Sequence, residues 1–138
     1  MVPTTLLIIR GMPGSGKTTL GKLVSDVMFS ADDYFTHNGV YTFDSTKLPE
    51  AHEWCKKNVR ESLVLALGGN HRKKVAVANT FSEHWEFLPY VFMAQELDVQ
   101  FFVIDLFTQD LDYKQLQARC VHDVPDHTLL RMFDRWQH

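Results

Sequence analysis

The stretch Gly11-Met-Pro-Gly-Ser-Gly-Lys17-Thr18-Thr19 directly follows the apolar run Leu6-Leu-Ile-Ile9. It fits the pattern G-x-x-x-x-G-K-[ST], and it lies where that pattern is meaningful, between an expected buried strand and an expected helix. Backbone N–H groups of such a loop, together with the N-terminus of the following helix, bind phosphate groups. Lys17 would reach the β- and γ-phosphates, and the hydroxyl of Thr18 would hold Mg²⁺. This phosphate loop therefore predicts binding of a nucleoside triphosphate, with the contacts made by Gly11, Met12, Pro13, Gly14, Ser15, Gly16, Lys17, Thr18 and Thr19.

The composition is that of an ordinary globular protein. The 138 residues are 45% hydrophobic and 22% charged, so we expect residues 1–138 to form one domain with a real core. No apolar run approaches the roughly 20 residues of a membrane helix, and the N-terminus lacks the basic region of a signal peptide. Cys55 and Cys120 lack the spacing of metal ligands. We interpret them as reduced thiols of a soluble, cytoplasmic protein.

Apolar periodicity divides the chain into alternating strands and helices. The expected strands are residues 4–9, 28–30, 75–78 and 99–106. The expected helices are residues 17–27, 46–67, a segment capped by Thr80 or Ser82, 110–119 and 126–136. The helix after the third strand has the apolar residues Trp85, Leu88, Phe92 and Leu97, and the last helix would bury Leu129, Leu130, Phe133 and Trp136. Such regular alternation predicts an α/β fold, with a parallel sheet of about four to five strands and helices on both faces.

Two adjacent aspartates follow the expected second strand. Ligands of a parallel sheet bind beyond the carboxyl ends of its strands, and Asp32 and Asp33 lie at such an end. Phosphoryl transfer to an alcohol needs a carboxylate that orients the acceptor hydroxyl and takes its proton. We interpret Asp32 as this general base and Asp33 as a supporting or structural acid; a capping pair in a turn is the alternative.

Further motifs carry a family resemblance over nearly the whole chain. The phosphate loop followed by Ser30-Ala-Asp-Asp-Tyr-Phe35 resembles the 5′-hydroxyl polynucleotide kinases of phage type. In that family the first aspartate after the second strand is the general base, which corresponds to Asp32. The resemblance implies a P-loop NTPase fold with a helical lid. A second set of segments resembles the kinase-like domains of animal ubiquitin-ligase-binding proteins: Gly39-Val-Tyr-Thr-Phe-Asp44, Ala51-His-Glu-Trp-Cys55, Asn79-Thr-Phe81 and Arg131-Met-Phe-Asp-Arg-Trp136.

The resemblance also suggests roles for residues outside the phosphate loop. Arg119 falls on the expected lid helix, where kinases of this family place an arginine over the phosphates, and its guanidinium would stabilise the charge of the transferring group. Tyr41 and Phe43 would stack an acceptor base or would simply cover the core. The full set of candidate substrate contacts is Asp33, Tyr41, Phe43, His52, Asn79 and Thr80.

Two positions depart from the family pattern. Ala78 stands where related proteins usually carry an aspartate that helps to hold Mg²⁺ through water, and Asn79 would replace it by hydrogen bonding only. Phe35 stands where the phage-type kinases have an arginine that contacts the acceptor phosphate. The departures leave open both the use of Mg²⁺ and the identity of the acceptor.

We therefore expect a kinase that uses ATP, or another NTP, and Mg²⁺. The leading acceptor is a polynucleotide 5′-OH of DNA or RNA, and the second is a hydroxymethylated base in DNA such as 5-hydroxymethyluracil. The net charge of −3 provides no global basic surface, which weakens a nucleic-acid substrate without excluding one. The alternatives are a small-molecule or nucleotide kinase and, because of Ala78, a nucleotide-binding interaction module with weak turnover. No membrane partner is expected.

Overall fold

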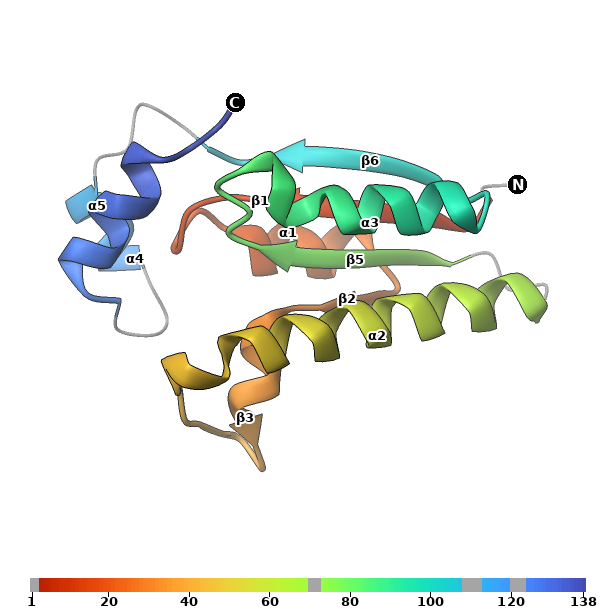
Figure 1. Ribbon diagram of the computed structural model, residues 1–138, viewed down its shortest axis with the longest axis horizontal. Coiled ribbons are helices and arrows are strands. Elements are labelled where there is room, and N and C mark those ends of the chain that lie inside the picture. Colours follow the sequence, from red (N-terminus) through yellow and green to blue (C-terminus); the bar gives the residue numbers. More distant parts are fainter. Residues whose placement is uncertain (1–2, 70–72, 108–112, 120–123) are drawn as a thin grey trace.

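The centre of the structure is a four-stranded parallel sheet (Figure 1). The computed structural model describes residues 3–69, 73–107, 113–119 and 124–138. Across the sheet the strands follow the order β2 (Val27–Phe29), β5 (Lys74–Asn79), β1 (Thr5–Arg10) and β6 (Gln100–Asp105). All three pairings are parallel, so the predicted parallel sheet is confirmed.

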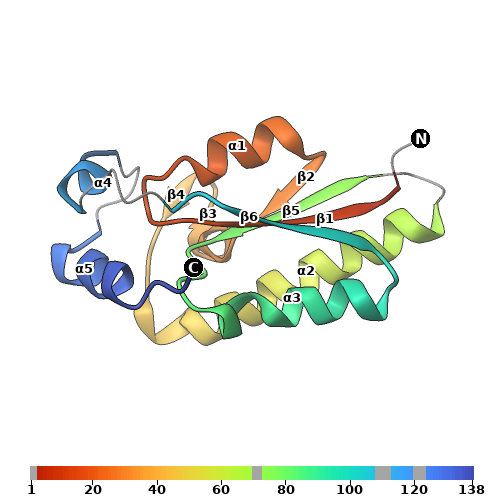
Figure 2. The same ribbon diagram turned by 90° about the horizontal axis from the view of Figure 1, so that it is seen from above.

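Helices cover both faces of this sheet, as the sequence predicts. Figure 2 shows α1 (Lys17–Val24) on one face and α2 (Leu48–Gly68) with α3 (His84–Glu96) on the other. The remaining helices, α4 (Tyr113–Arg119) and α5 (Asp126–Asp134), lie beyond the ends toward which the strands run (Figure 1). The phosphate loop leaves β1 at the same end, so the loop, α4 and α5 share one side of the molecule. Within the described ranges, no helix combines the length and the apolar character that a membrane crossing needs.

The buried stripe of α2 has the helical period that the sequence predicts. Ala51, Cys55, Val59, Leu63 and Ala66 are all buried, and they pack in one core cluster with residues of β1, β5 and α3. Cys55 is a free thiol whose pKa is raised by burial, in agreement with the interpretation as a reduced cysteine. The other cysteine, Cys120, lies outside the described residues.

Between β2 and α2 the chain is more structured than the plain loop expected for residues 36–44. A 3-10 helix (Ala31–Phe35) is followed by a hairpin of two short strands, β3 (Thr36–His37) and β4 (Val40–Tyr41). The long helix was expected from Thr46 but begins at Leu48, because Asp44 caps a separate 3-10 turn there: its carboxylate accepts from Thr46 N at 3.0 Å.

The first helix is shorter than the sequence predicts, and the second strand begins earlier. The expected helix extends to Val27, but α1 ends at Val24 and β2 begins at Val27. The chain turns at Asp26, where two hydrogen bonds of 2.8 Å join it to Lys74 at the start of β5. Pairing with β5 therefore ends the helical segment early.

Two of the apolar residues named for this helix do not face the core. Trp85 is 68% exposed and Phe92 is 59% exposed, whereas Phe87, Tyr90, Met93 and Ala94 are buried. Both rows have helical spacing, since residues 85, 88 and 92 repeat as residues 87, 90 and 94 do. Periodicity therefore shows that a helix is present but does not decide which of two apolar rows meets the sheet. The helix also begins later than expected, because Glu83 and Glu86 form its capping box.

Candidate functional site

The phosphate loop has the backbone geometry that its glycines predict. Gly14 and Gly16 have φ angles of 82° and 97°, in the left-handed region that favours glycine. Gly11 is required for another reason: a Cβ at this position would overlap Ser15 Oγ. Ser15 N donates to Met12 O at 3.0 Å and closes the loop. Each of these glycines thus has a geometric role in the loop.

The interior of the loop provides hydrogen-bond donors and a positive charge. Lys17 Nζ donates to the carbonyls of Gly11 and Met12 at 2.8 and 3.1 Å, so its charge lies at the loop. Ser15 Oγ is buried and has no hydrogen-bond partner among the described residues. The N-terminus of α1 follows at Lys17. A buried hydroxyl, a lysine and a helix N-terminus in one place fit a phosphate chain.

The residues available for a metal ion fit Mg²⁺ bound together with phosphates. Thr18 is exposed in the first turn of α1, where its hydroxyl would be the protein ligand. No cluster of three or more His, Cys, Asp or Glu side chains occurs in the part of the chain that the structure describes. Mg²⁺ commonly takes few protein ligands and keeps waters and substrate phosphates; the role of Thr18 as its ligand stays a prediction.

The two aspartates have different environments. Both lie in the 3-10 helix that follows β2. Asp33 accepts from Ser30 N at 3.2 Å and completes a capping box. The carboxylate of Asp32 is exposed, and its Oδ1 accepts from the hydroxyl of Tyr41 at 3.3 Å. Asp33 thus caps this turn, and its expected contact with substrate stays a prediction. Asp32 presents its carboxylate to solvent.

Asn79 joins the aspartate turn to the strand that precedes the phosphate loop. It lies opposite Arg10 in the pairing of β5 with β1. Its Oδ1 accepts from Ala31 N at 2.9 Å, and its Nδ2 points to Cys55 Sγ at 3.9 Å. These buried contacts fix Ala31, the neighbour of Asp32, relative to the sheet. The expected contact of Asn79 with substrate stays a prediction.

Ala78 and Thr80, the neighbours of Asn79 in the sequence, also lie at this strand end. Ala78 is buried, so no carboxylate of β5 is available at that position. Thr80 is half-buried, and its carbonyl accepts from Gly11 N at 3.2 Å. Thr80 thus lies directly beside the start of the phosphate loop.

Aromatic side chains surround the hairpin beside Asp32. Phe43, which is 51% exposed, stacks on Tyr41 with 6.5 Å between centroids and 15° between planes. Phe35 is buried beneath both rings. Burial and the charge of Asp32 raise the pKa of Tyr41 to about 12, so its hydroxyl is protonated and donates at neutral pH. Tyr41 is half-buried and packs against the core, whereas Phe43 is largely exposed. Stacking of an acceptor base on either ring stays a prediction.

The remaining two candidates, His52 and Arg119, are both exposed. His52 is exposed near the start of α2. Arg119 is the exposed last residue of α4, on the side of the sheet where the phosphate loop emerges (Figure 1). Among the described contacts no hydrogen bond joins Arg119 to the loop, so its role over the phosphates stays a prediction.

Sequence reasoning missed the contacts behind the loop. Met12 is buried in one cluster with Leu129 and Trp136 of the C-terminal segment, and Arg10 is a buried arginine at the end of β1. Leu130, expected in the same core, is exposed because it lies one position around the helix from Leu129. One signal for the buried role of Arg10 was available in the sequence, because this arginine stands between an apolar strand and a glycine loop.

Comparison with known proteins agrees with this geometry. A chain of the Pnkp1/Rnl/Hen1 RNA repair complex superposes with a TM-score of 0.71 and 22% identity, over 98% of this chain and 44% of the other. The APS kinase CysC of Mycobacterium tuberculosis (Cys556Ala mutant) superposes with a TM-score of 0.54 and 11% identity, over 97% and 99% of the two chains. A gluconokinase from Sinorhizobium meliloti 1021 gives 0.57 and 13%, over 100% and 78%. The fold is therefore that of P-loop kinases, as predicted, and it implies nucleotide binding.

Sequence relatives lead to the same group. Human NEDD4-binding protein 2 is 34% identical over 143 aligned residues, which are 99% of this chain but only 8% of that protein. The chain thus spans a small part of the length of this relative. A family model described as AAA domain (AAA_33) matches residues 6–138. The expected family resemblance is confirmed: the chain belongs to the AAA_33 family of P-loop domains, with kinases among its structural neighbours.

Proposed function

We propose that this protein transfers the γ-phosphoryl group of ATP, or of another NTP, to a hydroxyl group of a nucleic acid. The leading acceptor is a polynucleotide 5′-OH, and a hydroxymethylated base such as 5-hydroxymethyluracil in DNA is the second. The resemblance to a chain of an RNA repair complex supports the nucleic-acid class, and the kinase fold supports the reaction type.

One observation carries the proposal. An exposed carboxylate, Asp32, follows the strand end that Asn79 ties to the end of β1, where the phosphate loop begins. A phosphate-binding loop alone serves hydrolases and switches equally well. A carboxylate presented at the same sheet edge is what a kinase needs in addition, because the acceptor hydroxyl must be oriented and lose its proton.

In this mechanism each residue has a separate task. The loop amides and Lys17 hold the phosphates of the donor, and Arg119 on the lid helix α4 stabilises charge on the transferring group. Asp32 accepts the proton of the acceptor hydroxyl while that oxygen forms a bond to the γ-phosphorus in line with the departing ADP oxygen. Thr18 would hold Mg²⁺, which would supply positive charge to the phosphate oxygens.

The hairpin of β3 and β4 together with the flanking rings of Phe35 and Phe43, which we call the aromatic hairpin, supports a base-containing acceptor. Phe43 is 51% exposed and stacks on Tyr41, whose hydroxyl donates to Asp32, and a base stacks on an aromatic ring without any sequence requirement. Phe35 is buried and provides no charge for a phosphate at the acceptor end. This position therefore does not favour an ordinary polynucleotide 5′ end over a hydroxymethylated base.

The test offers radiolabelled ATP with Mg²⁺ to four samples: a 5′-OH oligonucleotide, hydroxymethyluracil-containing DNA, a set of nucleosides, and buffer alone. We expect label on one of the two nucleic acids. Asp32→Asn should lower the rate about 10³-fold while ATP still binds. Asp33→Asn is the matched control, because that carboxylate is engaged in a capping box, and it should retain far more activity.

Other outcomes select the alternatives. Label on nucleosides but not on polymers would indicate a small-molecule kinase and exclude the proposal. ATP binding without label on any acceptor would indicate a nucleotide-binding interaction module, the function that Ala78 favours. Equal rates for wild type and Asp32→Asn would remove Asp32 from the role of base.

A further inference from the structure

Arg10, the last residue of β1, is a buried arginine directly before the phosphate loop. Only 2% of it is exposed. Its guanidinium donates to three main-chain carbonyls: Nε to Phe81 O at 3.0 Å, and Nη2 to Ser82 O at 3.1 Å and Gln137 O at 2.6 Å. Nη1 lies 3.5 Å from Asp105 Oδ2. Burial lowers the pKa of Arg10, but a guanidinium remains charged at any physiological pH.

The same guanidinium lies between two aromatic rings. Its carbon is 4.3 Å from the centroid of Trp136 and 5.1 Å from that of Phe87. A planar, delocalised cation stacks on rings and donates in its plane at the same time, which a lysine ammonium does not. The geometry is therefore specific to arginine.

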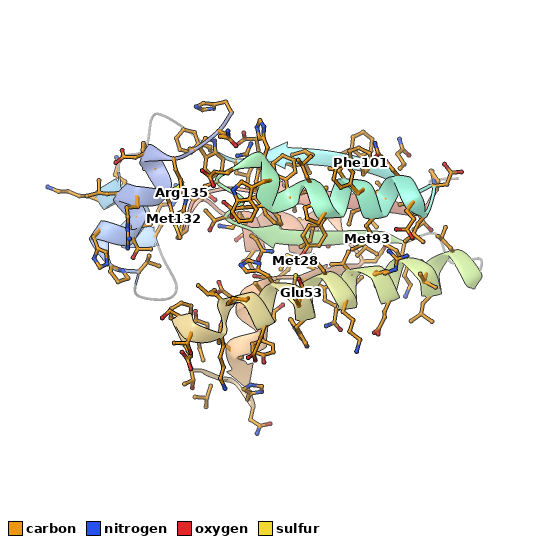
Figure 3. All side chains as sticks on the ribbon, viewed as in Figure 1. Met28, Glu53, Met93, Phe101, Met132 and Arg135 are labelled. Carbon is orange, nitrogen blue, oxygen red and sulfur yellow. The ribbon has the colours of Figure 1, made fainter. Side chains whose placement is uncertain are left out.

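Arg10 thereby holds the segment after α5 against the segment before α3. Gln137 N donates to Ser82 O at 2.7 Å, and Arg135 Nε donates to Ser82 Oγ at 2.8 Å. Figure 3 shows Arg135 and Met132 on the side of α5 that faces the rest of the molecule. We name this set of contacts, made by Arg10, Ser82, Arg135, Trp136 and Gln137, the C-terminal clasp.

Trp136 also connects the clasp to the phosphate loop. It shares a buried cluster with Met12, the second residue of the loop, and with Leu129 of α5. Its ring stacks on Phe107 with 4.6 Å between centroids. A continuous path of packed groups therefore runs from the phosphate loop through Trp136 to α5, and α5 packs on α4, which carries Arg119.

We infer that Arg10 is a positioning residue that, through Trp136, couples the occupancy of the phosphate loop to the placement of helices α4 and α5. The inference rests on the proposed function, because only a transfer reaction makes use of a placed Arg119. Fixing one end of α5 to the strand that bears the loop lets the loop and the lid move as one unit. Stability alone does not require this charge, since apolar groups of similar volume commonly replace buried ion pairs at no loss of stability.

The test uses Trp136 as its own reporter. The chain has three tryptophans, and Trp54→Phe with Trp85→Phe leaves Trp136 alone. We expect its fluorescence to change on titration with MgATP, at the same midpoint as ATP binding measured by calorimetry. Arg10→Lys in this background should bind ATP within about threefold of the parent, lose most of the Trp136 response, and transfer phosphate to a 5′-OH oligonucleotide with a kcat about tenfold lower.

The matched control is Arg60→Lys. Arg60 is also bonded to a carboxylate, that of Glu96, but it lies on the exposed surface of α2. This variant should keep both the Trp136 response and kcat. A general loss of folding in Arg10→Lys would lower the ATP affinity as well. A decrease in kcat and in the Trp136 response at unchanged ATP affinity is therefore not expected from such a loss.

Opposite results would overturn the inference. A folded Arg10→Lys protein with an unchanged Trp136 response and kcat would show that Arg10 is only a core residue. A wild-type protein that binds ATP and transfers phosphate without any change in Trp136 fluorescence would exclude the coupling but leave the proposed function intact. Absence of ATP binding would refute the proposed function itself.

If Arg10→Lys fails to fold, Met12→Ala replaces it as the test, because this variant removes the packing between the phosphate loop and Trp136 without changing the buried charge. A full Trp136 response in that variant would contradict the coupling.

Discussion

The phosphate loop and the aromatic hairpin lie at the same end of the sheet but are built differently. The loop is made of main-chain donors, left-handed glycines and a lysine bonded to loop carbonyls. The hairpin consists of two-residue strands and presents side chains, above all the half-exposed ring of Phe43. A site made from the backbone admits few sequences, whereas a site made from exposed side chains admits many. The sequence therefore predicts the nucleotide-binding part of the site well, and it predicts the proposed acceptor part much less well.

The largest effect should come from the donor side. Lys17→Met removes the only charge bonded to the loop carbonyls in the described structure, and we expect the transfer rate to fall about 10³-fold. Steady-state kinetics with labelled ATP measure this change. Lys22→Met, an exposed lysine of the same helix, is the control and should stay near wild type. A small effect of Lys17→Met would mean that the loop does not hold the reacting phosphates.

A smaller effect is expected for Gly11→Ala. The added Cβ overlaps Ser15 Oγ and meets Leu106 Cβ at 3.2 Å, so the loop must shift, and ATP affinity should fall about tenfold. Calorimetric titration with ATP measures this loss of affinity. The double variant Gly11→Ala/Ser15→Gly removes the main overlap and should recover part of the affinity. Gly68→Ala, where no atom lies within 4 Å of the new Cβ, should leave it unchanged.

A change in the aromatic hairpin should affect a different kinetic parameter, the KM for the acceptor. Phe43→Ala removes the exposed ring, and we expect KM for a 5′-OH oligonucleotide to rise about fivefold with KM for ATP unchanged. Val40→Ala in the same hairpin, at a position that is 63% exposed, provides the control. If both KM values rise together, the hairpin serves the fold rather than the acceptor.

The smallest effect is expected for Tyr41→Phe, which keeps the ring and removes the hydroxyl bonded to Asp32. The value of kcat should fall about threefold, because an exposed hydrogen bond of 3.3 Å contributes only near the lower end of the usual range, about 0.5 kcal/mol. Rates measured at saturating ATP and acceptor test this. No change would show that Asp32 needs no orientation by Tyr41.

The same variant tests the environment of the ring by its pH dependence. Burial and Asp32 raise the pKa of Tyr41 from 10.0 to about 12. The folded state therefore keeps a proton that the unfolded state loses, so this stabilisation is complete below pH 10 and disappears as the pH rises through about 12. Urea unfolding across that range should show a shallower alkaline loss for Tyr41→Phe. Tyr90 also has a raised pKa, but it is common to both proteins and cancels in the comparison.

The sequence predicts the sheet, the phosphate loop and the aspartate turn because each depends on local chemistry. A continuous apolar run before a glycine loop has few folded solutions, and β1 is accordingly buried at all its positions. The role of Asp33 as a capping acid likewise follows from its spacing to Ser30.

Features that depend on contacts between distant segments were not predictable in this way. The α3 helix has two apolar rows of equal spacing, and only the packing of Phe87 and Tyr90 against Phe81 decides between them. Arg10 and Gln137 are far apart in the sequence, so nothing local signals their hydrogen bond. The role of Phe43 toward an acceptor likewise stays a prediction, because its exposed ring and its contact with Phe35 do not identify a ligand.

The position of β1 between β5 and β6 has a consequence for how the molecule opens. All residues of β1 are buried and paired on both sides, whereas β2 has three half-buried residues paired only with β5. Amide hydrogens of β1 therefore exchange with solvent only when the whole sheet unfolds, while those of β2 and the hairpin exchange through local opening. The strand that leads into the phosphate loop is thus the most durable part of the fold, and the hairpin that is proposed to contact the acceptor is free to rearrange without disturbing it.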